Sequence, residues 1–336
     1  MLKVDVHTHI IPRNMPRWTE KFGYGNFIHL EDSKQEGFAR MMQGSTFFRE
    51  IASNCWDENL RMAEYRASGV DVQVVCTIPV MFSYDAKPQD ALELGRFLND
   101  HISDLVTKYP KNYVGLCTVP LKDVTLAIQE LERAKSIGFA GVQIGSNVNG
   151  LNLNEPQFFP FFEACSRLGM SVLVHPWDMM GKSQMEKYWL PWLVGMPAEM
   201  SRAACSMIFG GVFERLPNLR VLFSHASGAF LATLGRIEHG FNCRPDLVAI
   251  DNNVNPRAYL GKFWVDSITH DARLLKYVID MQGTNRICMG TDYPFPLGDL
   301  KFGEYMEKMG LSQPDLENLF HSSALSWLDL DVNKFK

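Results

Sequence analysis

Two histidines separated by one residue lie near the N-terminus, in the segment VDVHTHIIP at residues 4–12. Val4 and Val6 have the β-branched side chains that are typical of a buried strand. Because side chains on a strand alternate between its two faces, we expect His7 and His9 to point the same way. Two imidazoles on one face could bind a metal ion. They could equally be two polar loop histidines, and this segment alone does not decide between these readings.

Three more potential ligands follow other short apolar runs of the sequence. His175 ends the run in MSVLVHPWD, His225 follows VLFS, and Asp292 follows CMGT. Taken singly, His175 could be a core histidine and Asp292 could cap a turn before Pro294. However, the carboxyl ends of the strands in a parallel barrel meet at one rim. The recurrence of these residue types after four separate runs therefore predicts a metal centre at such a rim.

The elements that must position these residues form an alternating pattern. Longer amphipathic segments, among them 57–67, 89–108, 122–137 and 156–168, separate the short apolar runs. These runs cover residues 2–6, 70–78, 112–118, 140–145, 170–174, 218–224, 262–267 and 286–290. Eight strands joined by helices predict a (β/α)8 TIM barrel that occupies residues 1–336 as a single domain. An open doubly wound sheet would usually have a glycine-rich turn after its first strand, and HTHIIPRN is not such a turn.

Two segments interrupt the alternation. Residues 12–48 show no clear helix, so we expect an insertion between the first strand and the first helix, forming a small β-subdomain at the barrel mouth. Residues 183–200 form a second elaboration, after the fifth strand of the barrel. Both segments would lie at the rim that carries the chemistry, where loops commonly shape a binding site.

Composition narrows the classes of function. The formal net charge of −5 and the pI near 6.0 argue against a nucleic-acid surface. No apolar run approaches the ~20 residues of a membrane span, and no secretory signal pattern is present, so we expect no membrane association. The seven cysteines are scattered and form no CxxC pair. This favours reduced thiols and a cytoplasmic location.

An HxH pair, two later histidines and a final aspartate at strand ends resemble the amidohydrolase superfamily. Binuclear members carry a bridging lysine at the end of strand 4, whereas this chain reads GVQIGSN there, with Gln143 and no lysine. The resemblance therefore implies one metal ion rather than two. Imidazole and carboxylate ligands suit Zn²⁺. The implied ligands are His7, His9, His175 and Asp292. His225 remains free to act on water or substrate, as an imidazole can exchange a proton near neutral pH.

A closer resemblance covers nearly the whole chain. Its motifs are PVMFSY (79–84), GVQIG (141–145), HPWDMM (175–180), YWLPWLVGMPAE (188–199), GRIEHGF (235–241), RPDL (244–247) and GTDYPFPLG (290–298). These segments resemble the family of 2-amino-3-carboxymuconate-6-semialdehyde decarboxylases. That family is zinc-dependent and oxygen-independent, and it acts in the kynurenine branch of tryptophan catabolism, where it limits quinolinate formation. The resemblance implies decarboxylation without an organic cofactor. The site residues alone would indicate only metal-assisted activation of water or substrate.

The same resemblance implies how a dicarboxylate substrate is bound. Arg49 matches the family's substrate arginine, and a guanidinium can hold a carboxylate through two hydrogen bonds. Arg236 matches a second arginine that the neighbouring subunit contributes, which implies a homodimer. A surface arginine and a helix salt bridge are the ordinary alternatives for these two residues. The apolar residues that match family positions near the substrate are Phe48, Met179, Trp192 and Phe295, although such side chains often only fill a core.

One departure from the family and several competing functions remain. The family commonly reads HGGGAF after strand 6, whereas this chain reads HASGAF, with Ala226 and Ser227. Because alanine and serine adopt positive φ poorly, either this turn does not need that conformation or it is reshaped. The same metal site would also suit a γ-resorcylate-type decarboxylase or a mononuclear hydrolase of a cyclic ester or amide. A non-enzymatic metal-binding barrel is disfavoured, since no ligand is missing.

Overall fold

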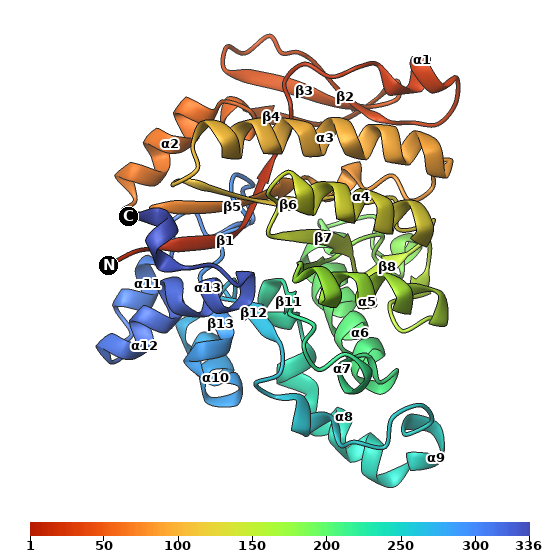
Figure 1. The fold of residues 1–336 in the computed structure, drawn as a ribbon, viewed down its shortest axis with the longest axis vertical. Coiled ribbons are helices and arrows are strands. Elements are labelled where there is room, and N and C mark those ends of the chain that lie inside the picture. Colours follow the sequence, from red (N-terminus) through yellow and green to blue (C-terminus); the bar gives the residue numbers. More distant parts are fainter.

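Eight parallel strands form the central sheet of the computed structural model, which describes residues 1–336 (Figure 1). In spatial order they are β1 (Val4–Ile10), β5 (Val72–Thr77), β6 (Tyr113–Cys117), β7 (Gly141–Gly145), β10 (Ser171–His175), β11 (Val221–Phe223), β12 (Trp264–Asp266) and β13 (Ile287–Cys288). Backbone bonds from Val6 to Met289 and from His9 to Tyr293 join the first strand to the last. The predicted (β/α)8 barrel is confirmed, and each predicted run overlaps one of its strands, although β1 and β10 extend beyond their runs to Ile10 and His175.

Helices cover the outside of this barrel. The main ones are α2 (Glu58–Ala67), α3 (Pro88–Lys108), α4 (Val124–Ser136), α5 (Phe159–Leu168), α6 (Met196–Phe209), α8 (Phe230–Cys243), α10 (Ala272–Gln282) and α13 (Ser323–Leu328). The four predicted helical segments correspond to α2, α3, α4 and α5. The residues that immediately precede α2, α4 and α10 are the N-caps Asp57, Asp123 and Asp271. Their carboxylates accept hydrogen bonds from backbone N–H groups of the first turn. No helix has the length and apolar character that crossing a bilayer requires.

The barrel interior is filled, so that chemistry is confined to its rim. Apolar side chains from all sides of the barrel, including Val6, Leu116, Leu173 and Leu222, pack together inside it. Trp327 of α13 joins this cluster and closes the end where the strands begin, since its carbonyl accepts a hydrogen bond from Ser171 at the start of β10. The opposite end, where the strands finish, is left open for polar side chains.

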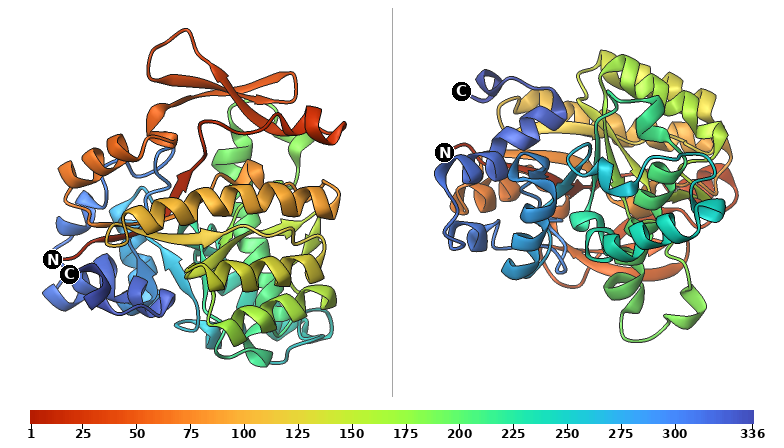
Figure 2. Two further views of the ribbon diagram at one scale, coloured as in Figure 1. Left: turned by 45° about the horizontal axis from the view of Figure 1, so that its top comes forward. Right: turned by 90° about the horizontal axis from the view of Figure 1, so that it is seen from below.

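The segment between β1 and α2 forms a small antiparallel sheet. Its elements are α1 (Trp18–Phe22), β2 (Ile28–Asp32), β3 (Phe38–Gln43) and β4 (Thr46–Ala52). The left view of Figure 2 shows this sheet rising above the barrel. Met41 of β3 and Trp18 of α1 belong to the same buried apolar cluster as Leu94 and Leu98 of α3. The expectation of no helix in residues 12–48 was wrong at Trp18–Phe22, because five residues are too few to show a helical period. The status of this segment as a subdomain stays a prediction.

A second elaboration follows β10. It contains the 3₁₀-helix η4 (Lys182–Gln184) and the π-helix η5 (Pro191–Gly195), which leads directly into α6. In the right view of Figure 2 this green segment projects away from the barrel. The remaining strands and α-helices are short: β8 (Asn147–Val148), β9 (Leu151–Asn152), α7 (Val212–Arg215), α9 (Pro245–Val248), α11 (Glu304–Glu307) and α12 (Gln313–Glu317).

Candidate active site

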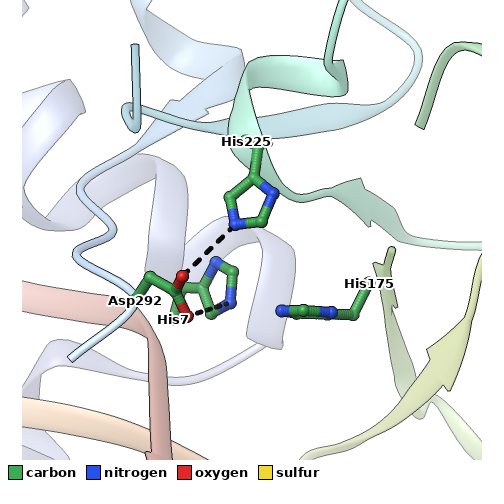
Figure 3. Close-up of side chains that lie close together, drawn as sticks. All are labelled: His7, His175, His225 and Asp292. Carbon is green, nitrogen blue, oxygen red and sulfur yellow. Dashed lines mark ion pairs between the residues drawn. The ribbon is translucent and has the colours of Figure 1, made fainter. Parts of the chain in front are cut away.

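Four histidines and one aspartate converge at the carboxyl ends of the barrel strands. Figure 3 shows His7, His175, His225 and Asp292 of this cluster. His7 and His9 come from β1, which continues to Ile10, so both lie within the strand rather than after it. His175 ends β10, His225 begins the 3₁₀-helix η6 (His225–Ser227), and Asp292 follows β13. One oxygen of Asp292 lies 3.0 Å from Nε2 of His9 and 3.5 Å from Nε2 of His7, and the other lies 3.6 Å from Nε2 of His225.

Three of these imidazoles are held in one tautomer. The Nδ1 atom of His7 lies 2.8 Å from a carboxylate oxygen of Asp266, that of His9 lies 3.0 Å from the carbonyl of Thr77, and that of His175 lies 2.9 Å from the carbonyl of Pro176. These oxygens can only accept, so each ring donates from Nδ1 and, when neutral, keeps a lone pair on Nε2.

The three Nε2 atoms therefore fit a cation. Nε2 of His7 and Nε2 of His9 lie only 3.2 Å apart, so their lone pairs face each other. Nε2 of His175 is buried and has no hydrogen-bond partner. An adjacent carboxylate completes a donor set of imidazole nitrogens and one oxygen, which suits a divalent transition metal ion.

The local electrostatics favour the metal-binding protonation states of His9, His175 and Asp292. Burial and the neighbouring imidazoles lower the pKa of His175 well below its usual value, and burial also lowers the pKa of His9. Burial by itself would raise the pKa of Asp292, but hydrogen bonds from His225 and His9 and the charge of the imidazoles hold it well below its usual range. For His7, burial lowers the pKa, yet the hydrogen bond to Asp266 and nearby carboxylate charges raise it overall. The site thus attracts positive charge.

The cluster offers more donors than one ion needs. Donor atoms of His7, His175, His225 and Asp292 all lie within 4.8 Å of one another. Nε2 of His9 lies 3.0 Å from Asp292 and Nε2 of His225 lies 3.6 Å from it, so the geometry permits either residue as the third imidazole ligand. The structure brings all five predicted residues together, and the assignment of four as ligands and His225 as the proton-transfer group stays a prediction.

A cavity of about 320 Å³ opens beside the cluster. It is lined by His9, His175 and Asp292 of the cluster and by Phe48, Arg49, Met179, Trp192 and Phe295. The guanidinium of Arg49 lies over the rings of Phe48 and Phe295, 4.7 and 5.1 Å from their centroids, and forms no ion pair with a carboxylate. A mostly buried cation without an anionic partner is suited to receive an anionic ligand.

The chain matches the family model described as Amidohydrolase over residues 4–330. It is 54% identical to 2-amino-3-carboxymuconate-6-semialdehyde decarboxylase of Dictyostelium discoideum, over 99% of this chain and 93% of that protein. It belongs to the amidohydrolase superfamily and, within it, to the 2-amino-3-carboxymuconate-6-semialdehyde decarboxylase family. The Caenorhabditis elegans protein of the same name is 37% identical, over 98% of this chain and 95% of that protein. This member of the family is therefore a metal-dependent decarboxylase.

A solved structure supports the fold assignment. The 5-carboxyvanillate decarboxylase from Novosphingobium aromaticivorans, in complex with manganese and a nitrobenzoic acid, superposes with a TM-score of 0.82. The match covers 98% of this chain and 96% of that one at 20% sequence identity. At this identity the likeness establishes a shared barrel, and the substrate must be argued from the site.

Arg236 does not reach the cluster within one chain of this decarboxylase. It lies on α8, its side chain is exposed, and it lines neither the cavity beside Arg49 nor a second one of about 400 Å³ that reaches His225 from the α8 side. The other predicted substrate-side residues all line the cavity beside Arg49. A contact between Arg236 and a substrate would therefore need a second copy of the chain.

Several polar residues that support the decarboxylase site were not predicted from the sequence. Asp266 ends β12 and contacts His7, and the buried Arg61 of α2 donates to the carbonyl of His9 at 2.7 Å. Glu199 of α6 accepts from the backbone N–H of Met180 and fixes the loop after β10. Asp266 could have been found, because it lies near the end of the apolar run KFWVDS, where the other runs carry their candidate ligands. Arg61 and Glu199 lie in amphipathic helices, where no spacing marks them.

The turn after β11 keeps the conformation that its sequence disfavours. Ala226 and Ser227 have φ values of 51° and 63°, and His225 before them has 51°. The possibility that the turn does not need positive φ at these positions is therefore wrong. Backbone N–H groups of His225 and Ala226 both donate to the carboxylate of Asp266, at 2.9 Å each. These bonds help to hold a conformation that costs side-chain-bearing residues energy.

Proposed function

We propose that this protein decarboxylates 2-amino-3-carboxymuconate 6-semialdehyde to 2-aminomuconate 6-semialdehyde, with one Zn²⁺ per subunit and no organic cofactor. In this proposal it acts in the kynurenine branch of tryptophan catabolism and limits quinolinate formation. The observation that carries the proposal is the set of Nδ1-anchored imidazoles facing a cavity that contains the unpaired Arg49. The imidazoles support metal chemistry, and Arg49 supports a carboxylate substrate.

We assign His7, His9, His175 and Asp292 as the zinc ligands. His9 is preferred to His225 because its Nδ1 is anchored and it is almost fully buried, whereas the His225 side chain is 13% exposed and has no such anchor. When bound, the ion would act as a Lewis acid and would lower the pKa of a coordinated water to about 7. The seven cysteines are all unpaired, which supports a reducing, cytoplasmic setting.

His225 is the group placed to move a proton. Its ring borders the cavity on the α8 side and lies next to Asp292, which orients Nε2. We propose that it accepts a proton from water, whose hydroxide adds to the conjugated substrate at the carbon next to the one that bears the departing carboxylate, and that it then donates this proton to the carboxylate-bearing carbon. When CO₂ leaves, the electron pair of the broken C–C bond re-forms the C=C bond of the conjugated chain and expels the hydroxide, so that no organic electron sink is required.

Substrate recognition is assigned to the opposite wall. Arg49 would bind one substrate carboxylate through charge-assisted hydrogen bonds. Phe48, Met179, Trp192 and Phe295 would enclose the conjugated chain. Arg236 would contact the substrate in the partner's site of a homodimer. The exposed apolar side chains of Leu193, Val194, Leu247 and Ile250 support such an association, because surfaces of this kind commonly mark interfaces.

The proposal is tested by adding zinc-loaded protein to freshly generated semialdehyde. We expect the near-ultraviolet absorbance of the substrate to fall with release of CO₂ and without quinolinate formation, at one zinc per subunit. Decay no faster than the spontaneous reaction would contradict the substrate assignment. Turnover of γ-resorcylate in its place would favour the aromatic decarboxylase alternative, and a metal content of two or none would contradict the single-ion site.

A further inference from the structure

One buried carboxylate, that of Asp266, contacts both His7, a proposed metal ligand, and His225, the proposed proton-transfer group. Asp266 at the end of β12 is fully buried. Its Oδ2 accepts from Nδ1 of His7 at 2.8 Å and from the backbone N–H of His225 at 2.9 Å. Its Oδ1 accepts from the backbone N–H groups of Ala226 at 2.9 Å and Ile268 at 3.2 Å. Three of these bonds come from the segments that carry His7 and His225, and the fourth comes from Ile268, just after β12.

We propose that Asp266 is a positioning residue that fixes the proton-transfer group His225 relative to the metal-holding His7. The inference rests on the proposed function. The bond to Nδ1 sets the tautomer in which Nε2 of His7 can bind a metal. The bond to the backbone of His225 holds that residue at a φ of 51°. Because one oxygen makes both bonds, the separation of the two rings, 5.3 Å between centroids, depends on a single atom.

The surroundings of Asp266 support this role. No lysine or arginine pairs with it; its ion-pair partner is His7. Two of its remaining bonds come from the successive backbone N–H groups of His225 and Ala226 in the left-handed turn, an arrangement that binds anions, and the third comes from Ile268. Gly290, just after β13, leaves space for the contact: a Cβ there would lie 2.8 Å from Cβ of Asp266 and 3.2 Å from Cβ of His7. The two side chains can approach because residue 290 has no side chain.

The decisive variant is Asp266→Asn, which keeps the size of the side chain. An amide can accept on one side only, so its NH₂ group must face either His7 and His225 or Ala226 and Ile268. We expect metal affinity, measured by competition with a chromophoric chelator, to fall by about 10–100-fold. At saturating metal we expect kcat to fall by about tenfold or more while KM changes little, since misplacing a proton-transfer group weakens general acid–base catalysis.

Glu130→Gln is the matched control. Glu130 on α4 is equally buried and accepts hydrogen bonds from Asn99, Arg96 and Arg133, none of which is a histidine. This control should lower the free energy of unfolding and leave metal affinity and kcat as they are. If both variants behave alike, Asp266 is a stability residue and the inference is wrong.

A second variant covers the case in which Asp266→Asn does not fold. Gly290→Ala pushes on Asp266 and His7 without changing charge, and should lower metal affinity and kcat in the same direction by a smaller factor. Gly240→Ala on α8, where a Cβ meets nothing within 4 Å, is its control. Wild-type metal affinity and kcat in folded Gly290→Ala or Asp266→Asn would overturn the inference while leaving the proposed function intact. Failure of the unsubstituted protein to bind metal or turn over substrate would instead overturn the proposed function.

Discussion

The two walls of the site are built differently. On the barrel side, His7, His9 and His175 are buried, and each ring is anchored through Nδ1 to an acceptor at a strand end. On the other wall, which the added sheet contributes, the guanidinium of Arg49 lies over the rings of Phe48 and Phe295. The first wall is preorganised before any ligand arrives, whereas the second offers an unsatisfied charge. Reaction class thus depends on the barrel, and substrate choice depends on segments that can vary without moving its strands.

Removing a ligand from the barrel wall should have the largest effect. In His9→Ala we expect the protein to lose its metal ion and kcat to fall by about 1000-fold or more, because the ion supplies several kcal/mol of transition-state stabilisation and each 1.36 kcal/mol is a factor of ten. Metal content after dialysis and steady-state kinetics measure both effects. If His9→Ala keeps its ion and His225→Ala loses it, then His225 is the ligand and the two roles must be exchanged.

The second prediction separates proton transfer from metal binding on the same wall. His225→Ala should keep one metal ion per subunit and lose about 10²–10⁴-fold in kcat, the usual contribution of a general acid–base group. His239 of α8, an exposed histidine that lines neither cavity, provides a matched control, since His239→Ala should leave kcat unchanged. Near-normal turnover of metal-loaded His225→Ala would remove this residue from the mechanism.

The same contrast explains what the sequence could reveal. The strands and the residues at their ends were predictable, because short apolar runs and the single rule of a shared rim place His175, His225 and Asp292 together. The acceptors that anchor the imidazoles were not predictable, since every residue has a backbone carbonyl and nothing in the sequence distinguishes that of Thr77. Arg49 was found through resemblance only, because its place over the cavity depends on how an inserted sheet packs on α3.

On the opposite wall, loss of the Arg49 charge should change binding rather than chemistry. Arg49→Met should raise KM by about 10–100-fold, since hydrogen bonds to a charged group contribute about 1.5–3 kcal/mol, and metal content should stay the same. Arg49→Lys is the control that keeps the charge and loses the paired donors, so an intermediate KM is expected. An unchanged KM in Arg49→Met, or loss of the metal ion, would show that the two walls are not independent.

A smaller effect on KM is expected for Arg236→Ala, because Arg236 is exposed and any substrate contact depends on the partner. The informative experiment mixes subunits carrying Arg49→Ala with subunits carrying Arg236→Ala. If Arg236 acts across a dimer interface, each mixed dimer contains one site with both arginines and one with neither, so activity at low substrate concentration is regained on mixing. No recovery on mixing, with subunit exchange shown directly, would place Arg236 outside the partner's site.

The smallest effect tests whether preorganisation of the barrel wall stores strain. Ala226 and Ser227 both adopt the left-handed region, where a side chain costs about 1–2 kcal/mol per residue. Replacing either with glycine removes that cost, and the greater freedom of glycine in the unfolded chain offsets roughly 0.5–1 kcal/mol of the gain. We expect each variant to raise the free energy of unfolding by about 0.5–1 kcal/mol, measured by denaturant titration. Ala229→Gly, where φ is −89°, should instead lower it. If all three substitutions destabilise the protein alike, the turn is not strained, and the bonds from Asp266 to His225 and Ala226 hold a conformation that the chain already prefers.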